Sequence, residues 1–416
     1  MSRFPPEACS RRLAPLPVKV AAVEQDEHPA LAGRPVYLDY NATTPVDPRV
    51  LEAMQTALTT DFGNPSSANP YAEEPRRLLA RARAQLAALI GAAPTEIVFT
   101  ASGSEADALA IRGAVLARSA TVTGRPHVIT QVTEHPAVLA ACQHLRRWHD
   151  VEVTYLPVDH LGRLDPADVR AALTPDTVLV TVMHSNNETG TLQPIADIAQ
   201  ITGPRGVLLH TDAAQSAGKI HLRVDQLGVD LLTVVGHKMY APNGIAALYI
   251  RDGVTLEPLI GGGGQEGGVR AGTENVALVT ALGAAADLAA HALDAGETSR
   301  LTRLRDRLQA ELAERLPGRI HLHGHPTLRL PNTLNIHIEH VVGRELLAAA
   351  PGVAASTGSA CHAADGQPST GLLALGFTPG QAASALRLSL GRWTTPQQVI
   401  AAADSLAAGL TTSSSR

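Results

Sequence analysis

The chain has 416 residues, a formal net charge of −5, 45% hydrophobic residues and 3% aromatic residues. This length can bury a large core and suggests two or three domains. The small net charge argues against nucleic acid and against an anionic membrane as partners. Three cysteines cannot form a paired disulfide framework, and their wide spacing fits no metal knuckle. We therefore expect a reducing, cytoplasmic setting and no metal site. We also expect no segment as long and apolar as the ~20 residues that span a bilayer.

The chain begins with a segment, 1–34, that is rich in Pro, Ala and charged residues, and we predict a flexible N-terminal extension there. A short strand should start at Val36 and run into a turn before Pro45. A helix is predicted over 73–90 and should end at Gly91, because glycine is the usual residue after a helix.

Apolar segments then alternate with helical ones. The predicted helices cover 105–116 and 137–148, and the predicted strands cover 96–100, 127–132, 151–158, 177–184, 207–211, 231–235 and 245–250. This alternation predicts an α/β fold, a mostly parallel sheet with helices on both faces. Ligands of such sheets bind beyond the carboxyl ends of the strands.

A second, smaller unit should follow the sheet. A Gly-rich loop at 261–270 and an Ala-rich helical region at 276–316 lead into it. Its predicted strands lie near 319–322, 332–338 and 385–390, and Cys361 lies in a loop between them. We therefore predict a large domain over 35–295, of which 35–50 packs with the small domain, and a small C-terminal domain over 296–416 that carries the Cys361 loop.

The first candidate site residue is Lys238. A buried, β-branched strand stops at Gly236, which delivers Lys238 to the rim of the sheet. A partly desolvated amine there can lose its proton, as a lysine that forms a Schiff base with an aldehyde cofactor must do. The alternative is an ordinary solvated lysine.

Three further junctions between strands and helices carry polar residues. Gly103 and Ser104 start a helix whose free N–H groups suit a phosphate, although an N-cap by Ser104 explains the same pattern. Asp212 ends a buried strand and needs a cationic partner, which a protonated pyridine nitrogen would supply; a turn Asp is the alternative. His135 follows another strand and is suited to stack on a flat ring and shuttle protons, unless it is structural.

Four more residues complete the candidates. Gln215 is placed to donate to a ring oxygen, and Asn187 lies at a strand end, where a turn Asn is the alternative. Small residues around Cys361 predict an accessible loop in which His362 favours the thiolate. Arg387 lies in an apolar strand, and a buried guanidinium demands an anion, either a substrate carboxylate or a structural acid.

Three histidines alternate on or beside one short predicted strand of the small unit. They are His321, His323 and His325. Alternation over so short a segment is compatible with a metal site, but we expect these side chains to be solvated and not to bind metal.

A series of motifs resembles the cysteine desulfurase and selenocysteine lyase family, class V of the fold-type I enzymes that use pyridoxal 5'-phosphate (PLP). The resemblance runs from about Val36 to Val399, and the motifs recur in the family's order. They lie at 38–45, 63–67, 186–190, 211–216, 236–238, 270–275, 358–361 and 387–392. The resemblance implies a large domain with a mostly parallel seven-stranded sheet, a smaller α+β C-terminal domain and a homodimer.

The resemblance also implies roles for single residues. Lys238 would be the Schiff-base lysine, Asp212 would pair with the pyridine nitrogen, and His135 would stack on the ring. The ring oxygen would be contacted by Asn187 and Gln215, the phosphate by Gly103, Ser104, His237 and a Thr273 from the second subunit, and the substrate by Asn41, Asn187 and Arg387. Cys361 would be the nucleophile.

The implied reaction converts L-cysteine to L-alanine, leaves a persulfide on Cys361 and passes the sulfur to an acceptor protein, as in iron–sulfur cluster assembly. Two residues depart from the family pattern: Ser104 replaces a Thr, and Val235 replaces a Ser, which removes one phosphate contact. Segments such as 330–333 and 367–369 look closer to selenocysteine lyases, so L-selenocysteine is the alternative substrate. A class V aminotransferase and a non-catalytic scaffold for sulfur transfer are the remaining alternatives.

Overall fold

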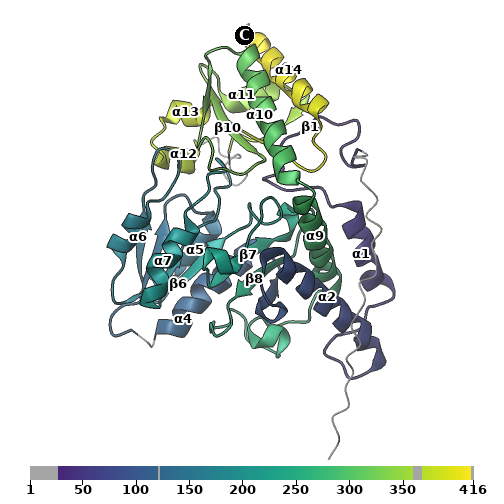
Figure 1. Ribbon diagram of the computed structural model, residues 1–416, viewed down its shortest axis with the longest axis vertical. Helices are drawn as coiled ribbons and strands as arrows, with labels where there is room; N and C mark the ends of the chain where they lie inside the picture. Colours follow the sequence, from purple (N-terminus) through teal and green to yellow (C-terminus); the bar gives the residue numbers. More distant parts are fainter. Residues whose placement is uncertain (1–26, 120–121, 359–367, 414–416) are drawn as a thin grey trace, which may run out of the picture.

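The computed structural model describes residues 27–119, 122–358 and 368–413 (Figure 1). Most of the predicted extension lies outside this range, but its last residues are attached to the fold. His28 is buried, its Nε2 lies 2.9 Å from the Val46 carbonyl oxygen, and its ring centroid lies 4.5 Å from that of Trp393. Residues on the N-terminal side of the predicted boundary at residue 34 are therefore part of the fold.

The large sheet has seven strands. From edge to edge they are β2 (Ile97–Thr100), β8 (Ala246–Ile250), β7 (Leu231–Val235), β6 (Leu208–Asp212), β5 (Thr177–Thr181), β3 (His127–Gln131) and β4 (Glu152–Leu156). Strand β8 is antiparallel to both of its neighbours, and all other pairs are parallel. The predicted α/β fold with a mostly parallel seven-stranded sheet is confirmed.

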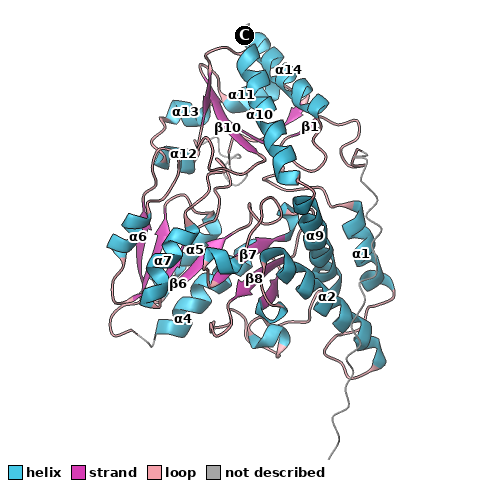
Figure 2. Cartoon of the chain, viewed as in Figure 1, coloured by secondary structure: helices cyan, strands magenta, loops and turns pink. Residues whose placement is uncertain are grey.

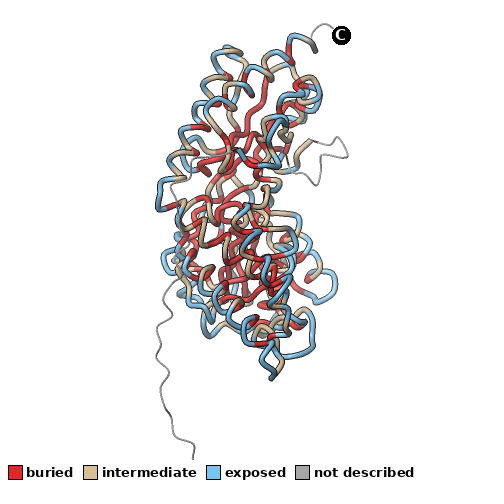
Figure 3. The backbone as a smooth tube through the Cα atoms, turned by 90° about the vertical axis from the view of Figure 1, so that its right-hand side faces the viewer, coloured by how far each residue is buried: buried red, intermediate tan, exposed pale blue. Residues whose placement is uncertain are grey.

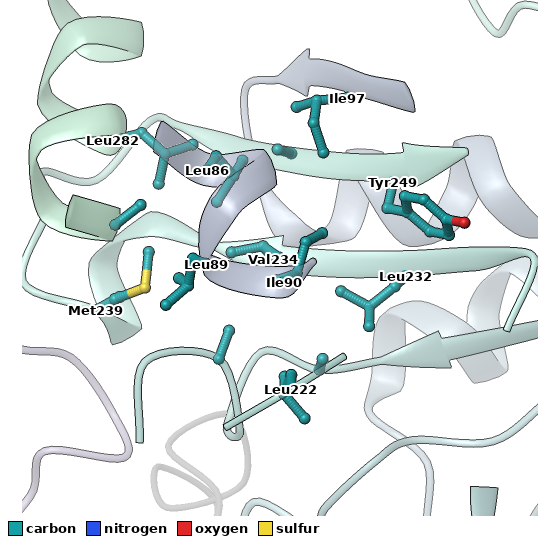
Figure 4. Packing of buried hydrophobic residues seen from close by; sticks show 14 of the residues in the cluster. Leu86, Leu89, Ile90, Ile97, Leu222, Leu232, Val234, Met239, Tyr249 and Leu282 are labelled. Atoms are coloured by element: carbon teal, nitrogen blue, oxygen red, sulfur yellow. The ribbon is translucent and has the colours of Figure 1, made fainter. Parts of the chain in front are cut away.

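Alternate side chains of the strands enter two separate cores, one on each face of the sheet. On one face, Leu232 and Val234 pack with α2 (Glu73–Ile90), α7 (Ile195–Thr202) and α9 (Val276–Asp294); Figure 4 shows Leu86 and Leu282 over these strands. On the other face, Leu231 packs with residues of three α-helices and one π-helical segment. These are α3 (Gly103–Ala108), the π-helical segment Leu109–Gly113, α4 (Ala114–Arg118) and α5 (Pro136–Trp148).

Helix α9 corrects one expectation from the sequence. By length and composition alone this 19-residue helix is long and apolar enough to cross a bilayer. Half of its apolar 18-residue stretch is buried inside the protein. Its residues share a core with α2 and with α1 (Pro48–Thr59) (Figure 1). Its composition is therefore explained by packing as a core helix.

The second unit has a three-stranded antiparallel sheet in the order β12 (Ala385–Ser389), β10 (Thr333–Ile338) and β9 (Ile320–Leu322). Figure 2 shows its helices beside this sheet. They are α10 (Glu297–Arg315), α11 (Gly343–Ala349), α12 (Thr370–Ala374), α13 (Pro379–Ala383) and α14 (Pro396–Ser413). Two short helices, α6 (Pro166–Ala172) and α8 (Val224–Leu227), lie in the part of the chain that forms the large sheet, α6 between β4 and β5 and α8 between β6 and β7.

The N-terminal segment joins the two units. Strand β1 (Val36–Tyr37) pairs in parallel with β11 (Val353–Ala354), and Leu38 is fully buried in the core of the second unit. Only a few residues later, the chain reaches the large sheet. Figure 3 shows buried residues concentrated inside both units. The domain boundary at residues 295 and 296 stays a prediction.

Candidate active site at the carboxyl ends of the strands

A cavity of about 420 Å³ lies beyond the carboxyl ends of the parallel strands, a volume typical of small-molecule sites. It is lined by ten of the candidate residues, which come from segments far apart in the sequence. They are Asn41, Gly103, Ser104, His135, Asn187, Asp212, Gln215, His237, Lys238 and Arg387. Eight of them end or follow strands that run in the same direction and therefore end at the same edge of the sheet, whereas Asn41 comes from the N-terminal segment and Arg387 from β12 of the second unit.

Lys238 lies directly after strand β7, in a single 3₁₀ turn over Gly236–Lys238. Its Nζ donates to the carbonyl oxygens of Asn41 at 2.5 Å and Ala42 at 2.7 Å. Both carbonyls belong to the N-terminal segment that also lines the cavity. The amine is thus half-buried at the rim of the sheet, as the sequence predicted.

Asp212 is the last residue of β6 and is buried. One of its oxygens accepts the backbone N–H of Ala214 at 2.8 Å. Burial raises the pKa of Asp212, whereas the neighbouring His135 and Lys238 lower it. A carboxyl group in this position would be stabilised in its charged form by a cation in the cavity.

A second buried acid, Asp107, lines the same cavity. Burial raises the pKa of Asp107 well above its ordinary value, and the charge of Asp212 acts in the same direction. Among the described residues its Oδ1 has no hydrogen-bond partner; His210 Nε2 lies 3.8 Å away. Two buried acids beside one cavity make that region favourable for a positively charged group.

His135 is the N-cap of helix α5. Its Nδ1 accepts the backbone N–H of Ala137 at 3.2 Å, so in the neutral ring the proton is on Nε2. Burial lowers the pKa of His135, an effect that Lys238 reinforces and Asp212 opposes. The neutral imidazole therefore presents its ring and an N–H group toward the cavity that it lines.

The start of helix α3 forms another wall. Ser102, not Ser104, caps this helix: its Oγ accepts the backbone N–H of Glu105 at 3.2 Å. This corrects the alternative interpretation of Ser104, whose side chain is exposed at the cavity. Glycine is required at 103, because a Cβ there would lie 2.5 Å from Cγ2 of Val235. The helix start therefore lies directly against strand β7.

His237 and Thr273 were both assigned to a phosphate. His237 lines the cavity, its Nδ1 lies 3.1 Å from Thr43 Oγ1, and burial lowers its pKa to about 4. Thr273 is exposed and is not among the residues that line the cavity. Its assignment to the site of a second subunit stays a prediction.

Arg387 is buried with 2% of its side chain exposed. Its Nη2 donates to Asp39 Oδ1 at 2.7 Å, and its Nη1 donates to the Asn187 carbonyl oxygen at 3.1 Å. Both alternatives from the sequence therefore meet here: a structural acid holds the guanidinium, and the guanidinium lines the cavity. Asn41 joins this wall by donating from Nδ2 to Thr333 Oγ1 at 2.9 Å.

The predicted nucleophile, Cys361, lies outside the described residues, as does His362. Cys142 is buried on α5, and burial raises the pKa of its thiol to about 12, which makes it a poor nucleophile. Within the described part of the chain, no group of His, Cys, Asp or Glu side chains could hold a metal ion.

The alternating histidines of the second unit differ from the expectation. His323 is fully buried, and its ring nitrogens lie 2.8 Å from Asn335 Oδ1 and from His337 Nδ1. The prediction that all three are solvated is wrong for His323, because this residue directly follows β9 and its side chain lies in the interior beside β10.

Sequence reasoning missed Asp107, Asp39 and Lys219. Asp107 lies on the helix that begins at Gly103, so helical spacing offered a signal for it. Asp39 and Lys219 lie in irregular segments, where neither the helical period of about 3.6 residues nor the strand period of two predicts which way a side chain points. Lys219 is buried and contacts two cavity residues, Gln215 and Asn41.

Comparison with known proteins agrees with this geometry. A family model described as aminotransferase class V matches residues 36–401. The chain belongs to the aminotransferase class-V family. This class-V member is 44% identical over 368 residues to the cysteine desulfurase IscS of Dictyoglomus turgidum, which covers 88% of the chain and 92% of the relative. It is also 44% identical over 370 residues to a cysteine desulfurase of Mus musculus, covering 88% of the chain and 79% of the relative.

Solved structures resemble this class-V protein over most of its length. A NifS-like protein superposes with a TM-score of 0.83 at 32% identity, covering 91% of this chain and 100% of the other. The structure described as SspA in complex with cysteine has a TM-score of 0.75 at 36% identity, covering 85% of this chain and 98% of the other. The class-V fold of this chain is therefore shared with structures of the NifS-like type.

Proposed function

We propose that this protein is a cysteine desulfurase that uses PLP to convert L-cysteine to L-alanine and passes the sulfur to an acceptor. The observation that carries the proposal is the meeting of Lys238, Asp212, His135 and Arg387 in one cavity. The relatives named as cysteine desulfurases support it, since their similarity extends over 88% of the chain.

The residues present fit PLP. Lys238 offers an amine for covalent attachment of an aldehyde, and the start of α3 at Gly103 and Ser104 offers backbone N–H groups for a phosphate. The buried acid Asp212 suits a protonated ring nitrogen, because a cation there would stabilise the charged form of a carboxyl group whose pKa is raised by burial. When bound, PLP supplies an electron sink for bonds at the substrate's α-carbon.

The protein's own residues would bind the substrate and move protons. Arg387 would receive the substrate carboxylate, with Asn41 and Asn187 beside it on the same wall. Lys238 Nζ would take and return the proton at the α-carbon, and His135 would hold or donate a proton at Nε2. Asp212 and Arg387 are buried, so water has limited access to these two side chains.

Cys361 would accept the sulfur atom. Its thiolate would attack the substrate sulfur, so that an S–S bond forms as the substrate C–S bond breaks, and the carbon released gains a proton to give alanine. The persulfide would then pass its outer sulfur to an acceptor protein, a scaffold or sulfurtransferase, as in iron–sulfur cluster assembly. We further propose a homodimer, in which Thr273 of the partner subunit completes the phosphate site, and a cytoplasmic location.

To test this proposal, purified protein is incubated with PLP and either L-cysteine or L-selenocysteine, and the alanine formed is measured together with sulfide or selenide. We expect alanine and sulfide from L-cysteine in the presence of a reductant, and Cys361→Ala should abolish sulfide release while PLP still binds. Alanine from L-selenocysteine alone would assign the protein as a selenocysteine lyase. Transfer of an amino group to a 2-oxo acid without alanine release from cysteine would favour an aminotransferase. No turnover of any substrate would contradict the proposal that the protein is an enzyme.

A further inference from the structure

A buried lysine behind the cavity has no part in the reaction proposed above. Lys219 lies between β6 and α8, and its residue is 7% exposed. The whole chain has three lysines, Lys19, Lys219 and Lys238, against 31 arginines. In a chain that uses arginine at almost every cationic position, two of these three lysines lie at one site, which points to a requirement for an amine at position 219.

The contacts of Lys219 are with residues of the cavity wall. Its Nζ donates to Gln215 Oε1 at 2.9 Å and to Asn41 Oδ1 at 3.3 Å. Gln215 in turn donates from Nε2 to the Asn41 carbonyl oxygen at 3.0 Å, and the same carbonyl oxygen accepts from Lys238. Lys219 thus holds the side of Gln215 that faces away from the cavity.

These contacts allow only one orientation of the Gln215 amide. If the amide were turned by 180°, its NH₂ group would face the donor Nζ of Lys219 and its oxygen would face the Asn41 carbonyl oxygen. The contact between the two oxygens would be repulsive, and the hydrogen bond from Lys219 to Oε1 would be lost. In the observed orientation the NH₂ group uses one hydrogen for the Asn41 carbonyl oxygen, and its second hydrogen remains for a ligand in the cavity, which Gln215 lines.

The chemistry of lysine explains why an arginine would not serve. Burial holds the pKa of Lys219 well below its ordinary value, and the charges of Lys238 and Arg387 act in the same direction. A lysine can give up its charge in such surroundings and still donate two hydrogens, whereas an arginine stays charged. A lysine therefore suits this buried position better than an arginine, because its single amine donates to both Gln215 and Asn41.

We infer that Lys219 is a positioning residue that fixes the Gln215 amide with its N–H directed at the cavity, so that Gln215 acts as a hydrogen-bond donor to an oxygen of the bound cofactor. The inference rests on the proposed function, because it takes PLP as the cavity's ligand. Lys219 would then affect cofactor binding only through the side chain of Gln215.

A double-mutant cycle on cofactor affinity tests this. The full chain is stripped of cofactor, and the dissociation constant of PLP is measured for the wild type, Lys219→Met, Gln215→Ala and the double variant. We expect Lys219→Met to weaken PLP binding about five-fold, the fold-change of one neutral hydrogen bond. In the Gln215→Ala background the same substitution should change the dissociation constant less than about two-fold, because the residue through which it acts is gone.

Two further variants keep the test decisive. Lys19→Met makes the same substitution at the chain's remaining lysine and should leave the affinity unchanged. Lys219→Gln keeps an N–H donor without the charge and replaces Lys219→Met in the cycle if the latter does not fold. Equal losses in both backgrounds, or wild-type affinity in Lys219→Met, would overturn the role of Lys219 alone, whereas a wild type that does not bind PLP would overturn the proposed function.

Discussion

Residues around the cavity divide into groups held by the backbone and groups held by other side chains. Lys238 and His135 are positioned by the backbone, the first after a strand and the second as a helix cap. Arg387 and Gln215 depend on side-chain partners, Asp39 and Lys219. Substitution of those partners should therefore change the site without touching any group that contacts a ligand.

Val235 gives a prediction at this scale. Its side chain lines the cavity against Gly103, where the family pattern has a serine. Val235→Ser should tighten PLP binding by about five-fold, because a hydroxyl adds one donor near the start of α3. Titration of cofactor-free protein with PLP measures the change, and Val235→Ala, which also shortens the side chain, is the control. Equal affinities of the serine and alanine variants would contradict a phosphate at this wall.

Secondary-structure elements differ in how strongly their ends are set by local sequence. Helix α10 follows α9 through Gly296, an exposed residue with a φ of +88° and with nothing within 4 Å of a Cβ placed on it. Only the backbone conformation, and no steric contact, requires glycine at this junction. A substitution at Gly296 therefore measures the free-energy cost of the left-handed conformation without a contribution from packing.

Gly296→Ala should therefore lower the free energy of unfolding by about 1–2 kcal/mol, the cost of placing an L-residue in the left-handed region. Gly380→Ala is a matched control: Gly380 is also exposed and also has nothing within 4 Å of its Cβ position, but it lies inside helix α13 and its φ is not positive. It should be neutral or slightly stabilising. Urea unfolding measures both, and equal effects would show that the backbone angle is not the cause.

The sequence predicted elements best where a local signal marks their ends. Helix α2 matches the prediction over 73–90 because Gly91, with a φ of +70°, ends it. The helical region 276–316 was predicted as one stretch, because good helix-forming residues on both sides, mainly Ala before Gly296 and Leu, Arg and Glu after it, obscure the break at that glycine. Helix α1 was missed, although Asp47 as a cap and Pro48 at the first position are ordinary start signals.

The candidate site was predictable to the extent that it lies at strand ends. Asp212 and Lys238 follow buried strands, and the parallel order places such ends together. Asp39 and Lys219 were not predictable from pattern, because their contacts join segments far apart in the chain. Asp39 meets Arg387 across 348 positions, and Lys219 meets Asn41 across 178.

The molecule as a whole buries several histidines in their neutral form. His184 lies 2.8 Å from Ser216 Oγ, and His210 lies 2.8 Å from Thr181 Oγ1. Burial lowers the pKa of His184 to about 4 and that of His210 to about 3. In the unfolded chain each would titrate near 6.5, so between these values the unfolded chain binds more protons than the folded one.

The contribution of these two histidines to the free energy of unfolding should therefore be largest above pH 6.5 and should fall as the pH falls toward 4, because their protonation favours the unfolded chain. Each histidine contributes up to about 1.4 kcal/mol per pH unit in this window. Urea unfolding at several pH values measures the slope. His184→Asn should reduce it, and His160→Asn, at an exposed position, should not; a slope unchanged by His184→Asn would contradict burial of the neutral ring.

The central claim is that Lys238 holds an aldehyde cofactor in the cavity at the strand ends. Borohydride reduction of the PLP-loaded protein fixes such a cofactor to the amine that carries it, and peptide mass spectrometry then locates the label. With only Lys19, Lys219 and Lys238 as candidates in the chain, the assignment is unambiguous. We expect the label on Lys238; a label on Lys219 or Lys19, or no label at all, would contradict the role proposed for Lys238.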